Sequence, residues 1–373
     1  MNTTWFSGDY ASARSRFRAA ANEIGWVLES HSIDRKGPNG EDLTIDVAMS
    51  PGIKKSPTLL VSSGIHGAEG FFGAAVQLGT LHQWASLFKH DSSAIRCVML
   101  HAVNPFGFAW GRRVNEENVD LNRNLLQTGD AFSGSPAGYT DLDALLNPRR
   151  VPSRWEPVRF KIMMAIIRYG MPALKQAVAS GQYDYPKGLF YGGNKPSRTS
   201  EILNEHIDRW LDDSESVFHL DLHTGLGRWG SYRLLIDHPL STPQQDWSNC
   251  HFGANSFESC SAEGTAYATR GSFGLWGSAR LKSRSYLYAA AEFGTYKAPV
   301  VLAALRAENQ CYHWGRKEDR ATVQAKEQLL EVFCPRSNSW RSHVLDEGIQ
   351  LVGRAANSLV NDRTPCACER TSN

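Results

Sequence analysis

The sequence predicts an α/β fold, a single domain whose mixed, mostly parallel twisted sheet has helices on both faces. Two short apolar runs, at 57–64 and 95–105, end in Gly and in Asn-Pro and enclose a helix-like segment from Ala68. Such a strand–helix–strand unit is typical of a parallel sheet. Two later apolar runs, at 216–225 and 285–294, also end in Gly. The 373 residues suffice to cover such a sheet with one large core.

The elements before the middle of the chain follow from hydrophobic periodicity. Residues 8–30 predict an amphipathic helix, and the alternation over 43–49 predicts a strand. Residues 126–200 are rich in Arg, Pro, Gly and Ser, which indicates a helical insertion or cap near the site, not a second core. One helix is predicted within it, over 157–179.

The second half of the chain returns to regular elements. A helix is predicted over 197–211, followed by strands over 216–225, over the segment YRLLID and over 285–294. From residue 298 the pattern is helical, and residues 361–373 form a polar tail. The whole chain, 1–373, is therefore interpreted as one domain.

Composition excludes several classes of protein. With 40 basic and 38 acidic side chains, the net charge of +2 argues against nucleic acid as an obligatory partner. No apolar run approaches the roughly 18 residues of a membrane span, and no signal-peptide pattern is seen, so we expect a cytoplasmic protein without a membrane partner. The seven cysteines lack framework spacing, which predicts that most are reduced.

Three predicted strands end in side chains that suit a metal site. His66 and Glu69 follow the strand at 57–64, His223 lies at the end of 216–225, and Glu292 lies at the end of 285–294. Ligands of open α/β sheets bind beyond the carboxyl ends of the strands, so these residues are expected to converge. Two imidazoles and one carboxylate leave the fourth position that catalytic Zn²⁺ requires. Glu292 is the candidate proton carrier, and Asp221 could orient an imidazole or cap a loop.

The segment 111–125, GRRVNEENVDLNRNL, is the second candidate region. It supplies Arg112, Arg113, Asn122 and Arg123 in a polar loop after the strand at 95–105. Arginine binds carboxylates through two parallel hydrogen bonds and also stabilises a developing oxyanion. The residues therefore suit a hydrolase of a small molecule or peptide that carries a free carboxylate. Which of Arg112 and Arg113 faces the site is open.

Other polar features have simpler interpretations. His101 and His219 lie within predicted strands and are expected to be hydrogen-bonded core residues, and the arginines of 148–168 are expected to form a solvated face. The segment GLGRWG, 225–230, matches a dinucleotide-binding pattern, but that pattern must open a helix directly after a strand. Here a predicted strand follows, so the glycines indicate a tight turn beside a ligand.

The order of these motifs resembles a known group of enzymes. His66-Gly-Ala-Glu69, the box Asp120-Leu-Asn122-Arg123 preceded by arginines, Asp221-Leu-His223 and Glu292 follow one another along the chain. This order resembles the zinc carboxypeptidase superfamily, on its aspartoacylase and succinylglutamate desuccinylase side. The segment 182–197 resembles a poorly characterised bacterial branch, a family of unknown function. The resemblance covers residues 40–310 approximately.

The resemblance implies roles for the candidate residues. His66, Glu69 and His223 would hold Zn²⁺, and Arg112 or Arg113 would polarise the scissile carbonyl. Asn122 and Arg123 would bind the terminal carboxylate of the substrate, and Glu292 would act as general base and acid. The arginines lie closer to Arg123 than in digestive carboxypeptidases, and the insertion has no counterpart there, so the substrate class does not transfer.

The implied activity is zinc-dependent hydrolysis of an amide. A carboxypeptidase and an N-acyl-amino-acid deacylase are both compatible with it. An insertion that seals the site would favour small acyl amino acids, and an open groove would favour peptides. The alternative to an enzyme is a non-catalytic, metal-free binding protein that retains the fold. The sequence carries no expectation for the oligomeric state.

Overall fold

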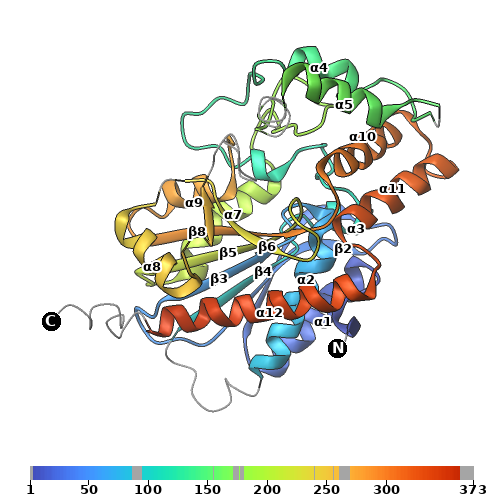
Figure 1. The fold of residues 1–373 in the computed structure, drawn as a ribbon. Helices are drawn as coiled ribbons and strands as arrows, with labels where there is room; N and C mark the ends of the chain where they lie inside the picture. The colour runs from blue at the N-terminus through green and yellow to red at the C-terminus, as the bar shows by residue number, and fades with distance from the viewer. Residues whose placement is uncertain are drawn as a thin grey trace.

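A central mixed sheet organises the molecule (Figure 1). The computed structural model describes residues 3–85, 95–153, 155–170, 176, 180–238, 240–254, 256–259 and 269–361. Within these residues the eight strands lie in the order β1-β2-β4-β3-β5-β8-β6-β7. They are β1 (Val27–Lys36), β2 (Asp42–Met49), β3 (Thr58–Ser63), β4 (Arg96–His101), β5 (Ser216–Gly225), β6 (Tyr232–Ile236), β7 (Phe257–Ser259) and β8 (Ser285–Gly294). The central strands β4, β3, β5 and β8 are parallel, which confirms the predicted fold class.

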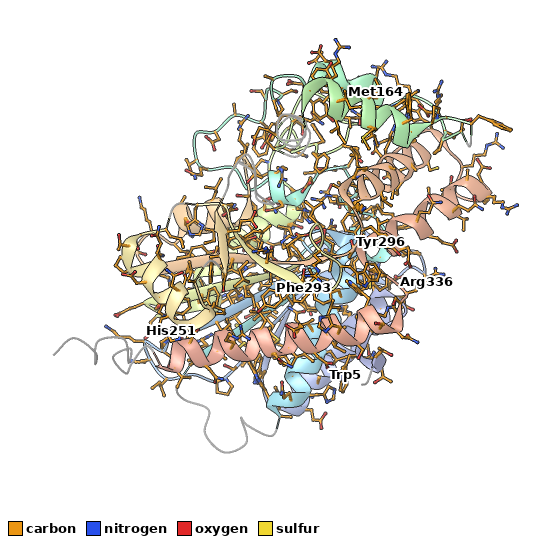
Figure 2. All side chains as sticks on the ribbon, viewed as in Figure 1. Trp5, Met164, His251, Phe293, Tyr296 and Arg336 are labelled. Carbon is orange, nitrogen blue, oxygen red and sulfur yellow. The ribbon has the colours of Figure 1, made fainter. Side chains whose placement is uncertain are left out.

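Helices cover both faces of this sheet. They are α1 (Tyr10–Glu23), α2 (Gly70–Trp84), α3 (Pro105–Trp110), α4 (Tyr139–Leu146), α5 (Val158–Tyr169), α7 (Arg198–Leu211), α8 (Thr242–Phe252), α9 (Phe273–Arg280), α10 (Ala298–Trp314), α11 (Arg320–Phe333) and α12 (Asn338–Asn361). One core packs α2 and α12 against the sheet, and Phe293 of β8 lies within it (Figure 2). A second core packs α7 and α9 against the opposite face. Burial on both faces explains why the central strands are almost continuously apolar.

The N-terminal helix is shorter than the sequence predicts. Helix α1 ends at Glu23, and Gly25 adopts a left-handed backbone conformation with φ of 75°. Residues 27–36, whose first part was included in the predicted helix, form β1 and pair antiparallel with β2. The prediction of a helix to residue 30 is wrong because a glycine in this conformation ends the helix and cross-strand pairing stabilises the following segment.

The insertion supplies helices on one side of the molecule. Helices α4 and α5 form a third apolar cluster with α10 and α11. Figure 1 shows α4 and α5 at the top of the molecule. Helix α5 ends at Tyr169 before Gly170, whose φ is 77°. The helix predicted over 157–179 is therefore confirmed in its first part, and residues 171–175 and 177–179 lie outside the described residues.

Two further expectations concern cysteines and membranes. Cys97, Cys311 and Cys334 are free, as predicted for most of the cysteines, and all three are buried, whereas Cys250 is disulfide-bonded. Cys366, Cys368 and nearly all of the predicted tail lie outside the described residues. Across the described ranges, no helix combines the length and apolarity needed to cross a bilayer.

Candidate functional site

The parallel strands bring the predicted ligands to one edge of the sheet. Strand β3 leads through Gly64 to His66 and to a 3₁₀ turn, Gly67–Glu69, that precedes α2. A side chain on Gly67 would meet the backbone of Gly107 at 2.0 Å, so a glycine is required for α3 to pack against this turn. On the neighbouring strands, His223 of β5 pairs in register with Glu292 of β8. The four residues therefore converge as the sequence predicts.

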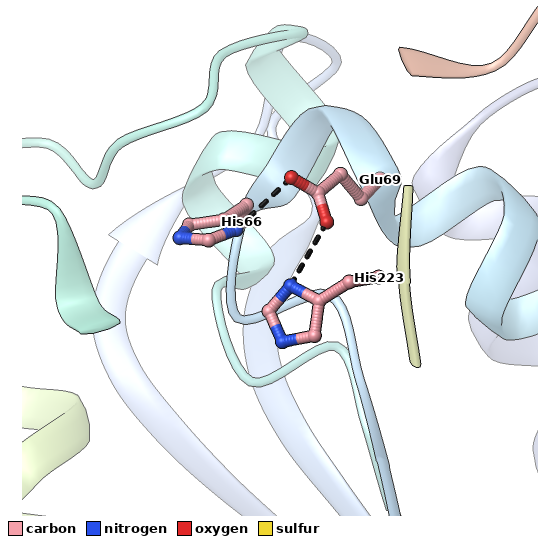
Figure 3. Close-up of side chains that lie close together, drawn as sticks. All are labelled: His66, Glu69 and His223. Carbon is pink, nitrogen blue, oxygen red and sulfur yellow. Dashed lines mark hydrogen bonds and ion pairs between the residues drawn. The ribbon is translucent and has the colours of Figure 1, made fainter. Parts of the chain in front are cut away.

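Three buried side chains form a compact donor set (Figure 3). The Nδ1 atom of His66 lies 3.0 Å from Glu69 Oε1, and the Nδ1 atom of His223 lies 3.1 Å from Glu69 Oε2. One ligand atom from each of the three residues lies within 4.8 Å of the other two. Two imidazole nitrogens around a carboxylate are a donor set that suits Zn²⁺.

A carboxylate lies behind each imidazole. His66 Nε2 lies 3.2 Å from Asp120 Oδ1, and His223 Nε2 lies 2.6 Å from Asp221 Oδ2. At His223 such a partner favours the tautomer that leaves Nδ1 unprotonated and facing Glu69. At His66, Nε2 also lies 2.8 Å from Arg113 Nη2. Within the described part of the chain, His66 Nδ1 is buried and makes no hydrogen bond, although it lies close to Glu69. A buried nitrogen lone pair of this kind fits a metal ligand.

Asp221 takes one of the two positions expected for it, beside an imidazole. The contact of Asp120 with His66 was not predicted. Asp120 follows His66 by 54 residues and reaches it because its backbone N–H donates to Tyr191 O at 2.7 Å, which fixes the loop. In the sequence, Asp120 was marked only as the first residue of the motif Asp120-Leu-Asn122-Arg123.

The electrostatics of the site are dominated by buried carboxylates. Burial raises the pKa of Glu69, but His66 and His223 outweigh this effect and hold the pKa well below its usual range. Burial, with Glu69 nearby, raises the pKa of Glu292 to about 7. Burial lowers the pKa of His223, but Asp221 and Glu69 outweigh it and raise the pKa well above its usual range. Glu292 can therefore exchange a proton near neutral pH, as a general base must.

The two adjacent arginines point to different places. Arg113 places Nη1 3.2 Å from Glu69 Oε1 and Nη2 2.8 Å from His66 Nε2, and it lines the pocket at the site. Arg112 is buried, pairs with Glu308 at 2.7 Å and stacks on the ring of Tyr312. Arg113 lines the pocket and Arg112 does not, so of the two alternatives left open by the sequence the structure favours Arg113. Arg112 is part of a structural ion pair.

A cavity of about 190 Å³ adjoins the donor set. Its polar wall includes Arg113, Asn122, Arg123 and Glu292, all of which were predicted from the sequence. The apolar wall is built largely by residues that were not predicted: Ile162, Ile166, Phe190, Leu235, Ile236, Val301, Leu302, Leu305 and Phe333. The pocket can therefore hold a ligand with one charged end and one apolar end.

The remaining predicted polar residues take supporting places. His219 contacts Tyr286 and Ser62 at 2.7 Å each, and His101 contacts Gln77 at 3.2 Å, so both histidines are hydrogen-bonded in the core as predicted. The glycine segment 225–230 is a turn between β5 and β6. Its Leu226 N–H donates to Glu292 Oε1 at 2.7 Å, which confirms a turn beside the site.

Comparison with protein families gives one match, to the family described as "Protein of unknown function (DUF2817)", over residues 6–347. The chain belongs to this family. The match confirms the expected relationship to a poorly characterised family and covers the sheet, the insertion and the complete donor set. No curated protein matches the chain.

Several solved structures of low sequence identity are similar to the chain. A provisionally named metallopeptidase from Shewanella baltica is 14% identical, with 92% of each chain covered and a TM-score of 0.42. Carboxypeptidase A from Helicoverpa armigera is 14% identical, with 86% of this chain and 73% of that chain covered and a TM-score of 0.43. The murein-tripeptide amidase MpaA from Escherichia coli O157 is 19% identical, with 80% and 97% covered and a TM-score of 0.38. Activity and substrate must be argued from this chain's own residues.

Proposed function

We propose that this protein is a zinc-dependent amide hydrolase whose substrate carries a free carboxylate. The observation that carries the proposal is the convergence of His66, Glu69 and His223, buried within 4.8 Å of one another, in a pocket that also holds Glu292 and Arg113. Both imidazoles present Nδ1 to this centre and contact a carboxylate through Nε2. This arrangement is typical of histidines that bind zinc.

Zinc bound by these residues would act as a Lewis acid and would acidify a water molecule. Glu292 would accept a proton from the attacking water and return it to the leaving amine. Its Oε1 atom accepts the Leu226 N–H at 2.7 Å, which fixes the carboxyl group at the pocket wall.

Arg113 and Arg123 would bind different negative charges of the substrate. Arg113 lies beside His66 and Glu69, where negative charge would develop on the attacked carbonyl oxygen, and its guanidinium would stabilise that charge. Arg123 and Asn122 line the same pocket, and Arg123 would bind the carboxylate. Asn122 Oδ1 accepts the Phe273 N–H at 2.8 Å, which holds the start of α9 against this wall.

The pocket walls favour an N-acyl amino acid as the substrate. Ile162, Ile166 and Phe190 of the insertion line the cavity, so the 126–200 segment supplies part of its apolar wall. An apolar acyl group would pack against these side chains, while Arg123 holds the carboxylate. Asp237 adds a carboxylate to the pocket, so amino acids with cationic side chains belong among the compounds tested.

Metal content and hydrolysis test the proposal together. We expect the purified protein to hold one zinc per chain by elemental analysis and His66→Ala to lose it. His251→Ala is the matched control, because His251 lies on α8, away from the donor set (Figure 2). N-acyl amino acids and dipeptides are then offered to the zinc-loaded protein. A folded wild type without metal that binds these compounds and cleaves none would instead indicate a non-catalytic binding protein.

A further inference from the structure

The outer side of the insertion carries a cluster of exposed apolar side chains. Among the described residues, thirteen large apolar side chains are exposed, and six of them lie between residues 151 and 167. We call this cluster the α5 surface. Its members are Val151, Trp155, Phe160, Met163, Met164 and Ile167. Figure 2 shows Met164 on the outer side of α5, at the end of the molecule far from α12. Clusters of exposed apolar residues usually mark an interaction site.

Helix α5 presents apolar residues on two sides. Ile162 and Ala165 are buried against the third apolar cluster and the pocket, as the packing of the insertion requires. Phe160, Met163 and Ile167 follow a spacing of three and four residues and form an outward stripe, with Phe160 63% exposed and Ile167 69% exposed. Trp155, just before the helix, is 86% exposed. Among the described residues, the outward stripe belongs to none of the three apolar clusters.

The segment that carries the stripe is mostly basic in sequence. Residues 148–170 contain six basic residues and one acidic residue, Glu156. That carboxylate already pairs with the buried Arg306 and with Lys161, each at 2.8 Å. Lys161 and Arg168 are exposed on α5 beside the apolar stripe. The surface therefore combines Trp, Phe, Met and Ile with a net positive charge.

This combination identifies the partner by its chemistry. Apolar and aromatic side chains flanked by Lys and Arg are typical of helices that lie at the interface of an anionic bilayer. A second copy of this chain fits poorly, because a twofold contact would bring two basic segments together. We propose that the α5 surface binds peripherally to an anionic lipid bilayer. The sequence alone indicates a solvated basic face here and no membrane partner, and the exposure of the apolar side chains changes that interpretation.

The proposal concerns binding and does not depend on hydrolysis. The test is co-sedimentation of the full-length protein with vesicles of phosphatidylcholine, with and without phosphatidylglycerol. We expect binding to the anionic vesicles only, weakened by added salt. The double substitution Phe160→Ser and Ile167→Ser should lower the partition coefficient by about 10-fold or more, because two exposed apolar groups no longer insert. Lys161→Gln with Arg168→Gln should also lower it.

Val323→Ser is the matched control, because Val323 is an exposed apolar residue on α11, outside the α5 surface. All variants are compared after circular dichroism confirms their fold. The proposal is overturned if the wild type ignores anionic vesicles, if neutral vesicles bind it equally well, or if the Phe160/Ile167 variant binds as the control does. It is also overturned if light scattering shows that the wild type is a dimer and the Phe160/Ile167 variant a monomer, and the variant binds vesicles as well as the wild type does.

Discussion

Replacing Glu292 by glutamine separates catalysis from stability at the proposed centre. The amide keeps the shape of the side chain and can still accept the Leu226 N–H at Oε1. It cannot accept a proton from water, so hydrolysis should fall by about 10²–10⁴-fold. Zinc content should stay the same, because His66, Glu69 and His223 are untouched.

The same substitution should stabilise the metal-free protein. Burial, with Glu69 nearby, raises the pKa of Glu292 from its ordinary 4.5 to about 7. Keeping this carboxylate ionised in the folded state therefore costs about 3 kcal/mol above pH 7. The folded chain holds the proton more tightly than the unfolded chain, so stability falls as the pH rises from 4.5 to 7. Glutamine removes that cost, and the gain should vanish below about pH 4.5.

Denaturant unfolding of the zinc-free proteins at pH 8 and at pH 4 measures this difference, and hydrolysis by the zinc-loaded proteins measures the catalytic loss. Glu318→Gln, at an exposed position, is the control and should change neither quantity. A Glu292→Gln protein that is less stable at both pH values would show that Glu292 is a structural partner. Undiminished hydrolysis by this variant would remove Glu292 from the mechanism.

Three further predictions concern charged side chains. The Arg209 hydrogen bond lowers the pKa of Glu29 to about 2. Glu29→Gln should therefore lower the free energy of unfolding by about 1 kcal/mol at pH 7, after solvent screening, and leave it unchanged near pH 2. Urea titrations that show an equal loss at both pH values would contradict this. Arg112→Met leaves Glu308 buried without its cation, so the free energy of unfolding should fall by about 3–5 kcal/mol while the zinc content stays the same. A variant that keeps its stability and loses zinc would instead place Arg112 at the site. Arg123→Gln should raise KM about 100-fold for a substrate with a free carboxylate but not for its methyl ester, and equal effects on both would argue against a carboxylate contact.

The sequence predicts the sheet core and the donor set for the same reason. Buried parallel strands are continuous apolar runs, and their carboxyl ends are where ligands bind, so His66, Glu69 and His223 could be placed together without coordinates. The strand β1 could not be predicted, because its residues Val27–Lys36 are mostly exposed and lack a buried face to set a clear pattern. The cross-strand partners in β2 decide its conformation.

Long-range contacts decide what the motifs leave open. Arg112 and Arg113 are adjacent and chemically identical, and distant partners such as Glu308, on α10 and 196 residues after Arg112, separate their roles. The walls of the pocket have the same origin, since Ile162 and Val301 come from helices that meet only in the folded chain. A pattern in the sequence reports the neighbours of a residue along the chain and not its partners across the core.

The register of the central strands makes the donor set rigid. Alternation along β5 places His219, Asp221 and His223 on one face of the sheet. Asp221 accepts the hydroxyl of Ser62 at 2.6 Å, from β3, and the hydroxyl of Tyr288 at 3.2 Å, from β8. These neighbouring strands hold Asp221, which in turn orients the imidazole of His223. Burying such a polar row costs free energy that hydrogen bonds only partly recover, and its position behind His223 supports the proposal that this imidazole binds a metal ion.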